Sequence, residues 1–125
     1  GPLCQGLAIA GEVSDGKSFE DALMAWRNAK TSGNLDHILS YYTPDFTSNG
    51  KTLAQWTPTL KTELSKVQGR TIQLKDVSYL RWTDSTDTMV VTFGEVAEGF
   101  RTGRTKRQYW MRQGNQWKIF FEGTM

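Results

Sequence analysis

The stretch RTIQLKDVSY, residues 70–79, is where helical periodicity ends and strand periodicity begins. Its apolar side chains recur at every second position, which is typical of a strand with one buried face. The parity of this alternation changes at Lys75 and Asp76, and such a change predicts a β-bulge that bends the strand. The alternating apolar positions are Ile72, Leu74, Val77 and Tyr79.

The same period of two continues toward the C-terminus and predicts three more strands. Turn-forming residues separate these strands at 84–87 and at 101–103. Because four strands follow one another through short connections, they predict an antiparallel meander. The three strand segments contain Met89, Val91 and Phe93, then Thr105 to Met111, then Trp117, Ile119 and Phe121.

Toward the N-terminus, apolar residues recur at helical spacing instead. Ser18 and Asp21 resemble a capping box and predict the start of a first helix, and Gly33 predicts its end. This spacing places one apolar stripe on the helix, which we expect to face the sheet. The stripe consists of Phe19, Ala22, Leu23, Trp26 and Ala29.

Asn34 predicts the cap of a second, short helix that runs to about Tyr42. Residues 45–51 predict a brief extended segment with a turn at Asn49 and Gly50. The buried face of the second helix contains Leu35, Ile38, Leu39 and Tyr42.

A third helix has two alternative starts. Thr52 and Gln55 form one capping pattern, which would leave Pro58 inside the helix, where a proline produces a kink. The other start has Thr57 as the cap and Pro58 at the first helical position, where its missing N–H is harmless. In both cases Leu60, Leu64 and Val67 form the buried stripe.

The composition describes one ordinary globular domain: 125 residues, 38% hydrophobic and 22% charged. The net charge of +2 is too small to indicate nucleic acid binding, and no apolar run approaches the ~20 residues of a membrane span. We therefore expect neither a nucleic acid partner nor a membrane span. Residues 1–17 are expected to be a flexible leader, in which Gly1 and Pro2 resemble the remnant of a cleaved tag, and residues 18–125 the domain.

Three helices followed by a bent antiparallel sheet of about four strands predict an α+β fold. In this order the chain resembles the nuclear-transport-factor-2-like (NTF2-like) superfamily, whose cone-shaped fold SnoaL-type cyclases and ketosteroid isomerases share. A more specific set of motifs consists of Ala25-Trp26, Tyr41-Tyr42-Thr43-Pro44-Asp45-Phe46, Trp56, Lys106-Arg107-Gln108-Tyr109-Trp110, Trp117-Lys118-Ile119 and Glu122. In these motifs the chain is similar to the accessory domain C-terminal to bacterial L,D-transpeptidase catalytic domains.

The resemblance implies a non-catalytic ligand-binding or dimerisation module, accessory to a cell-envelope protein that modifies peptidoglycan. It also implies a periplasmic or cell-envelope location, although the sequence is compatible with a cytoplasmic protein too. Ketosteroid isomerases carry a general base just after the second helix, and residues 47–50 here, Thr-Ser-Asn-Gly, contain no carboxylate or imidazole. The chain also lacks the Cys and His motifs of the L,D-transpeptidase active site.

The alternative is a small SnoaL-like isomerase, cyclase or hydrolase with a pocket built on Tyr41, Tyr42, His37 and Asp45. It requires these side chains to converge in one cavity. For the pocket in general, whether binding or catalytic, the candidate residues are Trp26, Tyr41, Tyr42, Asp45, Phe46, Tyr79 and Glu122.

We expect no metal and no cofactor, because the single histidine, His37, and the single cysteine, Cys4, cannot supply the four ligands of a zinc site. Cys4 allows no internal disulfide, and it is open as a lipid attachment site, a free thiol or a residue without function.

Six cations lie between residues 101 and 118 with no acidic residue among them. They predict either a solvated sheet edge or a patch for an anionic partner, such as a cell-wall fragment or an acidic protein surface. The sheet itself is a candidate surface for a homodimer. The six cations are Arg101, Arg104, Lys106, Arg107, Arg112 and Lys118.

Overall fold

The computed structural model describes residues 2–67, 69–81 and 87–125, with side chains from Lys17 onward. The predicted turn at 84–87 therefore falls almost wholly outside the described residues. The described chain contains three helices and six strands: α1 (Pro2–Ser32), α2 (Leu35–Leu39), β1 (Tyr42–Ser48), β2 (Lys51–Thr52), α3 (Leu53–Val67), β3 (Ile72–Arg81), β4 (Thr88–Ala97), β5 (Arg104–Gln113) and β6 (Gln116–Thr124).

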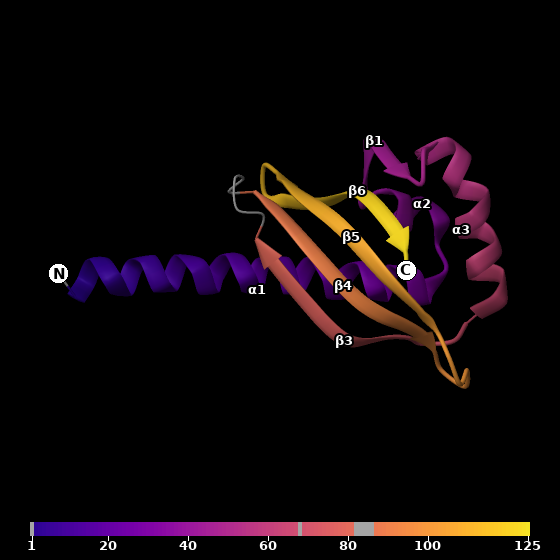
Figure 1. Ribbon diagram of the computed structural model, residues 1–125, viewed down its shortest axis with the longest axis horizontal. Helices are drawn as coiled ribbons and strands as arrows, with labels where there is room; N and C mark the ends of the chain where they lie inside the picture. Colours follow the sequence, from indigo (N-terminus) through magenta and orange to yellow (C-terminus); the bar gives the residue numbers. More distant parts are fainter. Residues whose placement is uncertain (1, 68, 82–86) are drawn as a thin grey trace.

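The predicted α+β architecture is confirmed. In Figure 1, α1 runs across one face of a curved sheet and α3 lies at one end of the sheet, beside β1. The strands of the described chain form a single sheet in the order β2-β1-β6-β5-β4-β3. The meander from β3 to β6 is antiparallel throughout, as predicted.

The sheet has six strands instead of the predicted four or so, because the second helix ends earlier than expected. α2 stops at Leu39, and the segment from Tyr42 onward is extended and pairs in parallel with β6. The backbone carbonyl of Tyr41 accepts a hydrogen bond of 2.7 Å from the amide of Ile119. Pairing with β6 gives the backbone N–H and C=O groups of β1 hydrogen-bond partners. A further helical turn is disfavoured there, because the residue before Pro44 avoids helical geometry.

The predicted turn at Asn49 and Gly50 is confirmed. Both residues adopt left-handed backbone conformations, with φ of 51° and 78°. They connect β1 to β2 as a two-residue hairpin loop, since Ser48 pairs directly with Lys51. Two left-handed central residues are typical of the tight turn that matches strand twist.

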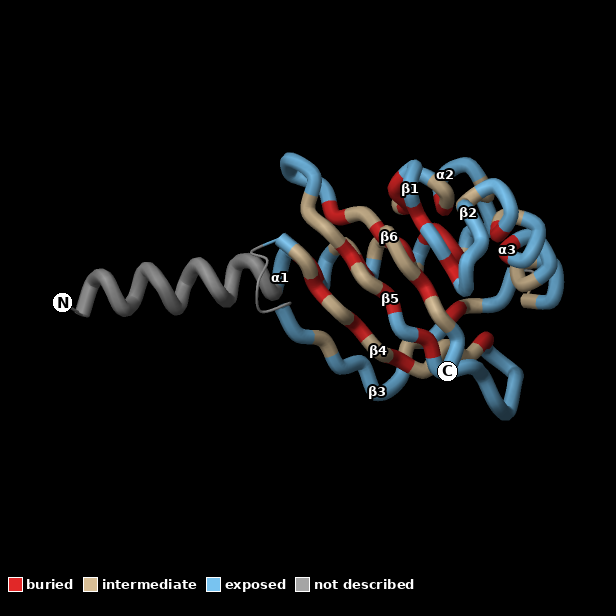
Figure 2. The backbone as a smooth tube through the Cα atoms, turned by 45° about the horizontal axis from the view of Figure 1, so that its top comes forward, coloured by how far each residue is buried: buried red, intermediate tan, exposed pale blue. Residues whose placement is uncertain are grey.

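The predicted bulge in β3 is confirmed as well. The register between β3 and β4 shifts between Lys75 and Ser78, and Asp76 has a φ of 53°. A second irregularity lies between β5 and β6, where Tyr109 pairs with Phe121 but Trp110 pairs with Ile119. Such bulges bend strands, and they give the sheet the curvature that Figure 2 shows.

The predicted N-terminal caps are confirmed for two of the three helices. Asn34 caps α2, and its side chain accepts a hydrogen bond of 3.1 Å from the amide of His37. Thr52 and Gln55 form a reciprocal capping box before α3, so Pro58 lies inside that helix and the alternative start at Thr57 is wrong. The third prediction fails, because α1 already begins at Pro2 and passes through Ser18. Ser18 instead accepts a hydrogen bond of 3.2 Å from the indole of Trp117.

Gly33 has a φ of 74° and ends α1 as predicted. The division into a leader of residues 1–17 and a domain of residues 18–125 stays a prediction.

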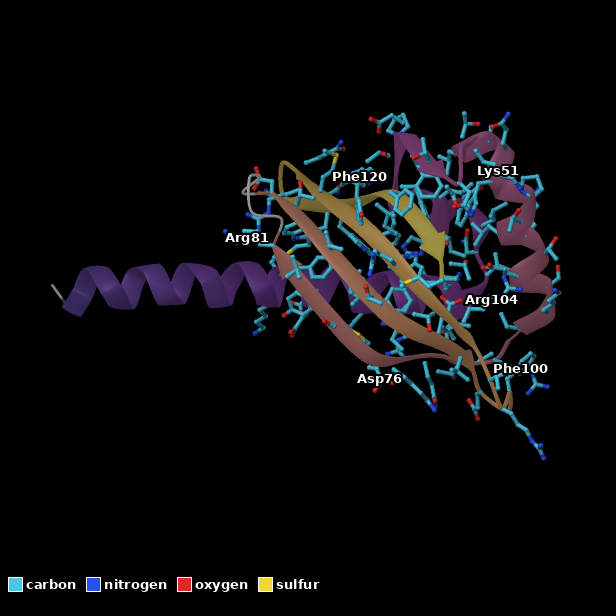
Figure 3. All side chains as sticks on the ribbon, viewed as in Figure 1. Lys51, Asp76, Arg81, Phe100, Arg104 and Phe120 are labelled. Atoms are coloured by element: carbon cyan, nitrogen blue, oxygen red, sulfur yellow. The ribbon has the colours of Figure 1, made fainter. Side chains whose placement is uncertain are left out.

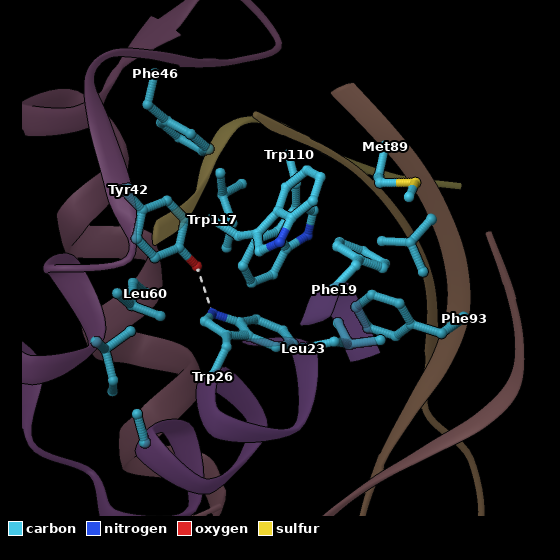
Figure 4. Packing of buried hydrophobic residues seen from close by; sticks show 14 of the residues in the cluster. Phe19, Leu23, Trp26, Tyr42, Phe46, Leu60, Met89, Phe93, Trp110 and Trp117 are labelled. Atoms are coloured by element: carbon cyan, nitrogen blue, oxygen red, sulfur yellow. Dashed lines mark hydrogen bonds between the residues drawn. The ribbon is translucent and has the colours of Figure 1, made fainter. Parts of the chain in front are cut away.

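The core lies between α1 and the concave face of the sheet and is rich in aromatic residues (Figure 4). Trp26 and Trp110 are fully buried and meet edge to face, with ring centroids 6.4 Å apart. Phe19 packs in the same manner against both Trp110 and Trp117. Figure 2 shows the corresponding alternation of buried and half-buried positions along β4 and β5. These rings fill the interior of the cone, so an open site has to lie at its end.

Candidate ligand site at the mouth of the cone

Three of the predicted pocket residues are parts of the core. Trp26, Tyr42 and Phe46 are all buried, and the rings of Tyr42 and Phe46 lie 5.0 Å apart. The indole of Trp26 donates a hydrogen bond of 3.2 Å to the Tyr42 hydroxyl (Figure 4). Burial, together with the nearby carboxylate of Glu122, raises the pKa of Tyr42 well above its usual value. Tyr42 therefore keeps its proton and holds the packing of the core.

The residues of the enzyme alternative converge only in part. His37 on α2 is exposed, and its ring centroid lies 5.6 Å from that of Tyr41. Asp45 is exposed on β1, while Tyr42 is buried in the core. Of this set, His37 and Tyr41 border one cavity of about 360 Å³, whereas Tyr42 and Asp45 do not line it.

The two remaining pocket candidates lie far from each other in the fold. Tyr79 on β3 donates a hydrogen bond to the carboxylate of Glu20 on α1, and this bond raises the pKa of Tyr79 to about 12. Glu122 is buried at the end of β6 and accepts a hydrogen bond of 2.7 Å from the Gln108 amide. Tyr79 thus ties α1 to the sheet, and Glu122 belongs to the polar end of the interior.

The six cations between residues 101 and 118 do not form one patch. Lys106 is fully buried, whereas Arg101, Arg104 and Arg107 are exposed. Strand alternation places Lys106 on the concave face and Arg107 on the convex one, where its Nε donates to the Thr92 hydroxyl. The other two are engaged at the opposite end of β5 and β6: Arg112 lies over the ring of Trp117 and Lys118 donates to the Ser40 carbonyl.

Six ion-paired side chains instead gather inside the cone, where α1, α3 and the sheet meet. Lys30 Nζ lies 2.9 Å from Glu95 and 3.6 Å from Glu63. Lys106 Nζ lies 3.1 Å from Glu63, 3.2 Å from Glu95 and 3.7 Å from Glu122. Arg104 adds a contact of 3.3 Å to Glu63 from the surface. We call these residues the ion-paired cluster: Lys30, Arg104, Lys106, Glu63, Glu95 and Glu122.

The cluster keeps Glu95 and Lys106 charged. Burial raises the pKa of Glu95, but the ammonium groups of Lys30 and Lys106 outweigh burial and lower the pKa to about 2. Burial lowers the pKa of Lys106, and the carboxylates of Glu122, Glu95 and Glu63 outweigh it, so the pKa lies well above its usual value. The Lys106 amine is therefore protonated at neutral pH and cannot act as a nucleophile or base.

A cavity of about 250 Å³ opens beside the cluster, between the C-terminal halves of α1 and α3 and the β4–β5 loop. Lys30, Glu63, Glu95 and Arg104 border it on the polar side. Its other wall is apolar, and a side chain on Gly103 would collide with the backbone of Glu95, so this glycine lets the loop approach β4. The apolar wall consists of Leu64, Val67, Ile72, Ala97 and Phe100.

Of the ion-paired cluster, the sequence predictions named Arg104, Lys106 and Glu122 but missed Lys30, Glu63 and Glu95. Each missed residue carried a signal, because it is a charge at a position whose periodicity is that of the core. Lys30 follows Trp26 by four residues, Glu63 follows Leu60 by three, and Glu95 continues the alternation that ends at Phe93. A charge at a core position predicts a buried ion pair.

The described residues hold no cluster of three or more histidine, cysteine, aspartate or glutamate side chains suited to a metal ion. Within the part of the chain that the structure describes, no helix has the length and hydrophobicity to cross a membrane.

Comparison with known proteins identifies a family. The family model described as the Cds6 C-terminal NTF2-like domain matches residues 18–123. No curated protein matches the sequence.

Solved structures share the fold at low sequence identity. Bd1075 of Bdellovibrio bacteriovorus gives a TM-score of 0.67 at 18% identity, over 89% of this chain and 39% of Bd1075. The helical cell shape determining protein Pgp2 of Campylobacter jejuni gives 0.65 at 18% identity, over 81% of this chain and 37% of Pgp2. A candidate ketosteroid isomerase of Shewanella frigidimarina gives 0.67 at 15% identity, over 86% of this chain and 94% of that protein. At these identities the similarity shows the fold alone, and this chain spans less than half of Bd1075 and of Pgp2.

Proposed function

The chain belongs to the family of Cds6 C-terminal NTF2-like domains, and from this premise we propose that it is a non-catalytic module that binds a ligand in the cavity at the mouth of the cone. We propose further that it is accessory to a cell-envelope protein that modifies peptidoglycan, and that it works in the periplasm or at the cell wall.

One observation carries the binding proposal. The cavity combines an apolar wall with charged groups, and ion pairs already hold those charges in place. Preformed, fixed polar groups beside an apolar surface are typical of a binding site. Acid–base catalysis requires a group whose pKa lies near the working pH, whereas Glu95 has a pKa of about 2 and Lys106 one far above neutrality.

The envelope context has separate support. Pgp2, which shares the fold, is by name a determinant of helical cell shape, and this chain covers 37% of it. Bd1075 is likewise longer than the matched region, and this chain covers 39% of Bd1075. A domain of this fold inside larger proteins, together with the resemblance to L,D-transpeptidase accessory domains, supports an accessory role.

The binding proposal is tested by NMR titration with soluble peptidoglycan fragments. We expect the fragments to shift the methyl resonances of Leu64, Val67 and Ala97, which line the cavity. The F100A variant removes an exposed ring from the cavity wall and should weaken binding, while L80A removes an exposed side chain from distant β3 and should not. Unshifted cavity methyls at saturating fragment concentration would refute the proposal.

A second candidate function, association through the sheet, rests on the convex face. The β5–β6 bulge places Phe121 opposite Tyr109, so both Phe120 and Phe121 contact the Tyr109 ring, at 5.8 and 4.9 Å. Half-buried aromatic residues on an outer sheet face are suited to a two-fold dimer. Light scattering should then report a dimer that F120S weakens, and a monomer at 100 µM, well above ordinary dimer affinities of about 1 µM, would contradict it.

A further inference from the structure

The pair Arg104–Glu63 differs from the other contacts of the ion-paired cluster because it lies at the surface. The Arg104 side chain is 53% exposed, whereas those of Lys30 and Lys106 are 2% and 0% exposed. Figure 3 shows Arg104 between the end of the sheet and α3. The pair also forms a partition, since Glu63 and Arg104 line both the main cavity and a second cavity of about 100 Å³ on the side of β1.

Arg104 can leave Glu63 at low electrostatic cost. Oε2 of Glu63 keeps Lys106 at 3.1 Å and Lys30 at 3.6 Å when the arginine moves away. Oε1 of Glu63 is the atom that loses its partner, because Arg104 is its contact within 3.3 Å among the described residues. Opening the pair therefore creates one guanidinium donor and one carboxylate acceptor at the same place.

The charges of the cluster indicate what fits between them. Three cations balance three carboxylates in the closed state. If a ligand carboxylate takes Arg104, two lysines remain against Glu63, Glu95 and Glu122, and the buried group carries one excess negative charge. An ammonium group on the same ligand would restore the balance and bind the vacated Oε1 of Glu63.

We propose that the cavity selects zwitterionic ligands, namely an amino acid or small peptide with free ammonium and carboxylate groups and an apolar side chain. The ligand carboxylate binds Arg104, its ammonium group binds Glu63, and its side chain lies on Leu64, Val67 and Phe100. The volume of about 250 Å³ lies just below that of drug-sized sites, which suits a ligand part of one or two residues. The exposed Lys66 at the rim adds attraction for the carboxylate.

The inference rests on the proposed binding function, and a matched set of probes tests it. Phenylalanine, N-acetylphenylalanine and phenylalaninamide share a side chain but carry both charges, only the carboxylate, and only the ammonium group. Methyl-detected NMR should show phenylalanine binding about tenfold more tightly than either derivative, as expected when one charged hydrogen bond is lost. In R104Q the preference over phenylalaninamide should disappear, because the partner of the ligand carboxylate is gone, and the preference over N-acetylphenylalanine, which depends on Glu63, should remain. R107Q, on the convex face, should keep both preferences.

Three outcomes would overturn the inference, and they differ in whether the proposed binding function survives. Equal binding of phenylalanine and N-acetylphenylalanine at the cavity would show an anion site, which refutes selection of zwitterions and leaves the binding function standing. Selection of zwitterions is refuted in the same way if peptidoglycan fragments shift the cavity methyls and none of the three probes does. If neither fragments nor probes shift them, the proposed binding function fails together with the inference.

Discussion

The two ends of the cone interior are built in opposite ways. One end is aromatic, where Phe19, Trp26 and Trp110 pack edge to face with little more than indole N–H groups to satisfy. The other end holds Lys106 and Glu95 in the ion-paired cluster. Burying apolar rings stabilises a fold directly, whereas burying charges costs a desolvation free energy that ion pairing only recovers in part. The comparison indicates that the aromatic end stabilises the fold, and that the buried charges of the other end are better explained by a role in ligand binding.

A single strand passes through both ends. The inward positions of β5 change from Lys106 to Gln108 to Trp110 along its length. Gln108 connects them, since its amide oxygen accepts a hydrogen bond of 2.9 Å from Trp110 and its amide nitrogen donates one of 2.7 Å to Glu122. Because both ends of its amide are hydrogen-bonded, Gln108 lies between the aromatic end and the charged end without an unsatisfied polar group.

The largest effect should come from breaking the aromatic end. Replacing Trp26 by alanine removes a fully buried indole and its hydrogen bond to Tyr42, and should lower the free energy of unfolding by about 3–5 kcal/mol. Urea unfolding followed by circular dichroism measures this change. W26F is the control, since it keeps an aromatic ring and should cost less than half as much. A loss below about 1 kcal/mol for W26A would remove Trp26 from the core.

Breaking the charged end should have a slightly smaller effect. K106M replaces the buried ammonium group by an apolar side chain of similar length, which leaves Glu63, Glu95 and Glu122 with one cation fewer and should cost about 3 kcal/mol. The loss is at the lower end of the usual range because Lys30 still compensates two of these carboxylates. Urea unfolding beside K118M, whose lysine lies outside the cluster, measures the difference. A K106M protein as stable as the parent would show that the cluster contributes nothing to folding.

Much of the fold could be predicted because local patterns and tertiary contacts agree. The parity change in β3 predicted the bulge at Asp76, and Asn49-Gly50 predicted the hairpin turn. The extended segment predicted at 45–51 covers only part of β1. The start of β1 was missed because Tyr42 has the spacing of α2, and only pairing with β6, more than seventy residues away in the chain, makes the extended form better. A long-range partner of this kind leaves no periodic signal in the segment itself.

The site was harder to predict than the fold. Tryptophan and tyrosine positions were expected to line a pocket, but large rings in a small cone fill it, as Trp26 and Tyr42 do. The three charged cavity residues that were missed come from three separate elements, with Lys30 on α1, Glu63 on α3 and Glu95 on β4. Their charges are visible in the sequence, but which cation meets which carboxylate depends on the packing of α1 and α3 against the sheet.

The charged end should also make stability depend on pH, by about 2 kcal/mol between pH 6 and pH 3. The folded-state pKa of Glu95 is about 2, below the ordinary value of 4.5, so the folded protein holds this proton less tightly than the unfolded chain. The stabilisation is therefore complete above about pH 5 and is lost as the pH falls toward 2, with about 2 kcal/mol gone at pH 3. Urea unfolding at pH 6 and pH 3 measures the loss, and E95Q should show a shallower dependence. An equal slope in E95Q would assign the effect to other carboxylates.

The smallest effect on stability should come from the exposed member of the cluster. R104Q removes a cation that is 53% exposed and leaves Glu63 paired with Lys106 and Lys30, so the expected loss is below about 1 kcal/mol. Urea unfolding of R104Q and K106M under one set of conditions measures the contrast between a surface partner and a buried partner of the same carboxylate. A loss above about 2 kcal/mol in R104Q would mean that Arg104 is needed to hold Glu63 in place. The arginine would then not be free to exchange Glu63 for a ligand. The surface cation Arg104 and the buried cation Lys106 would both be structural parts of the cluster.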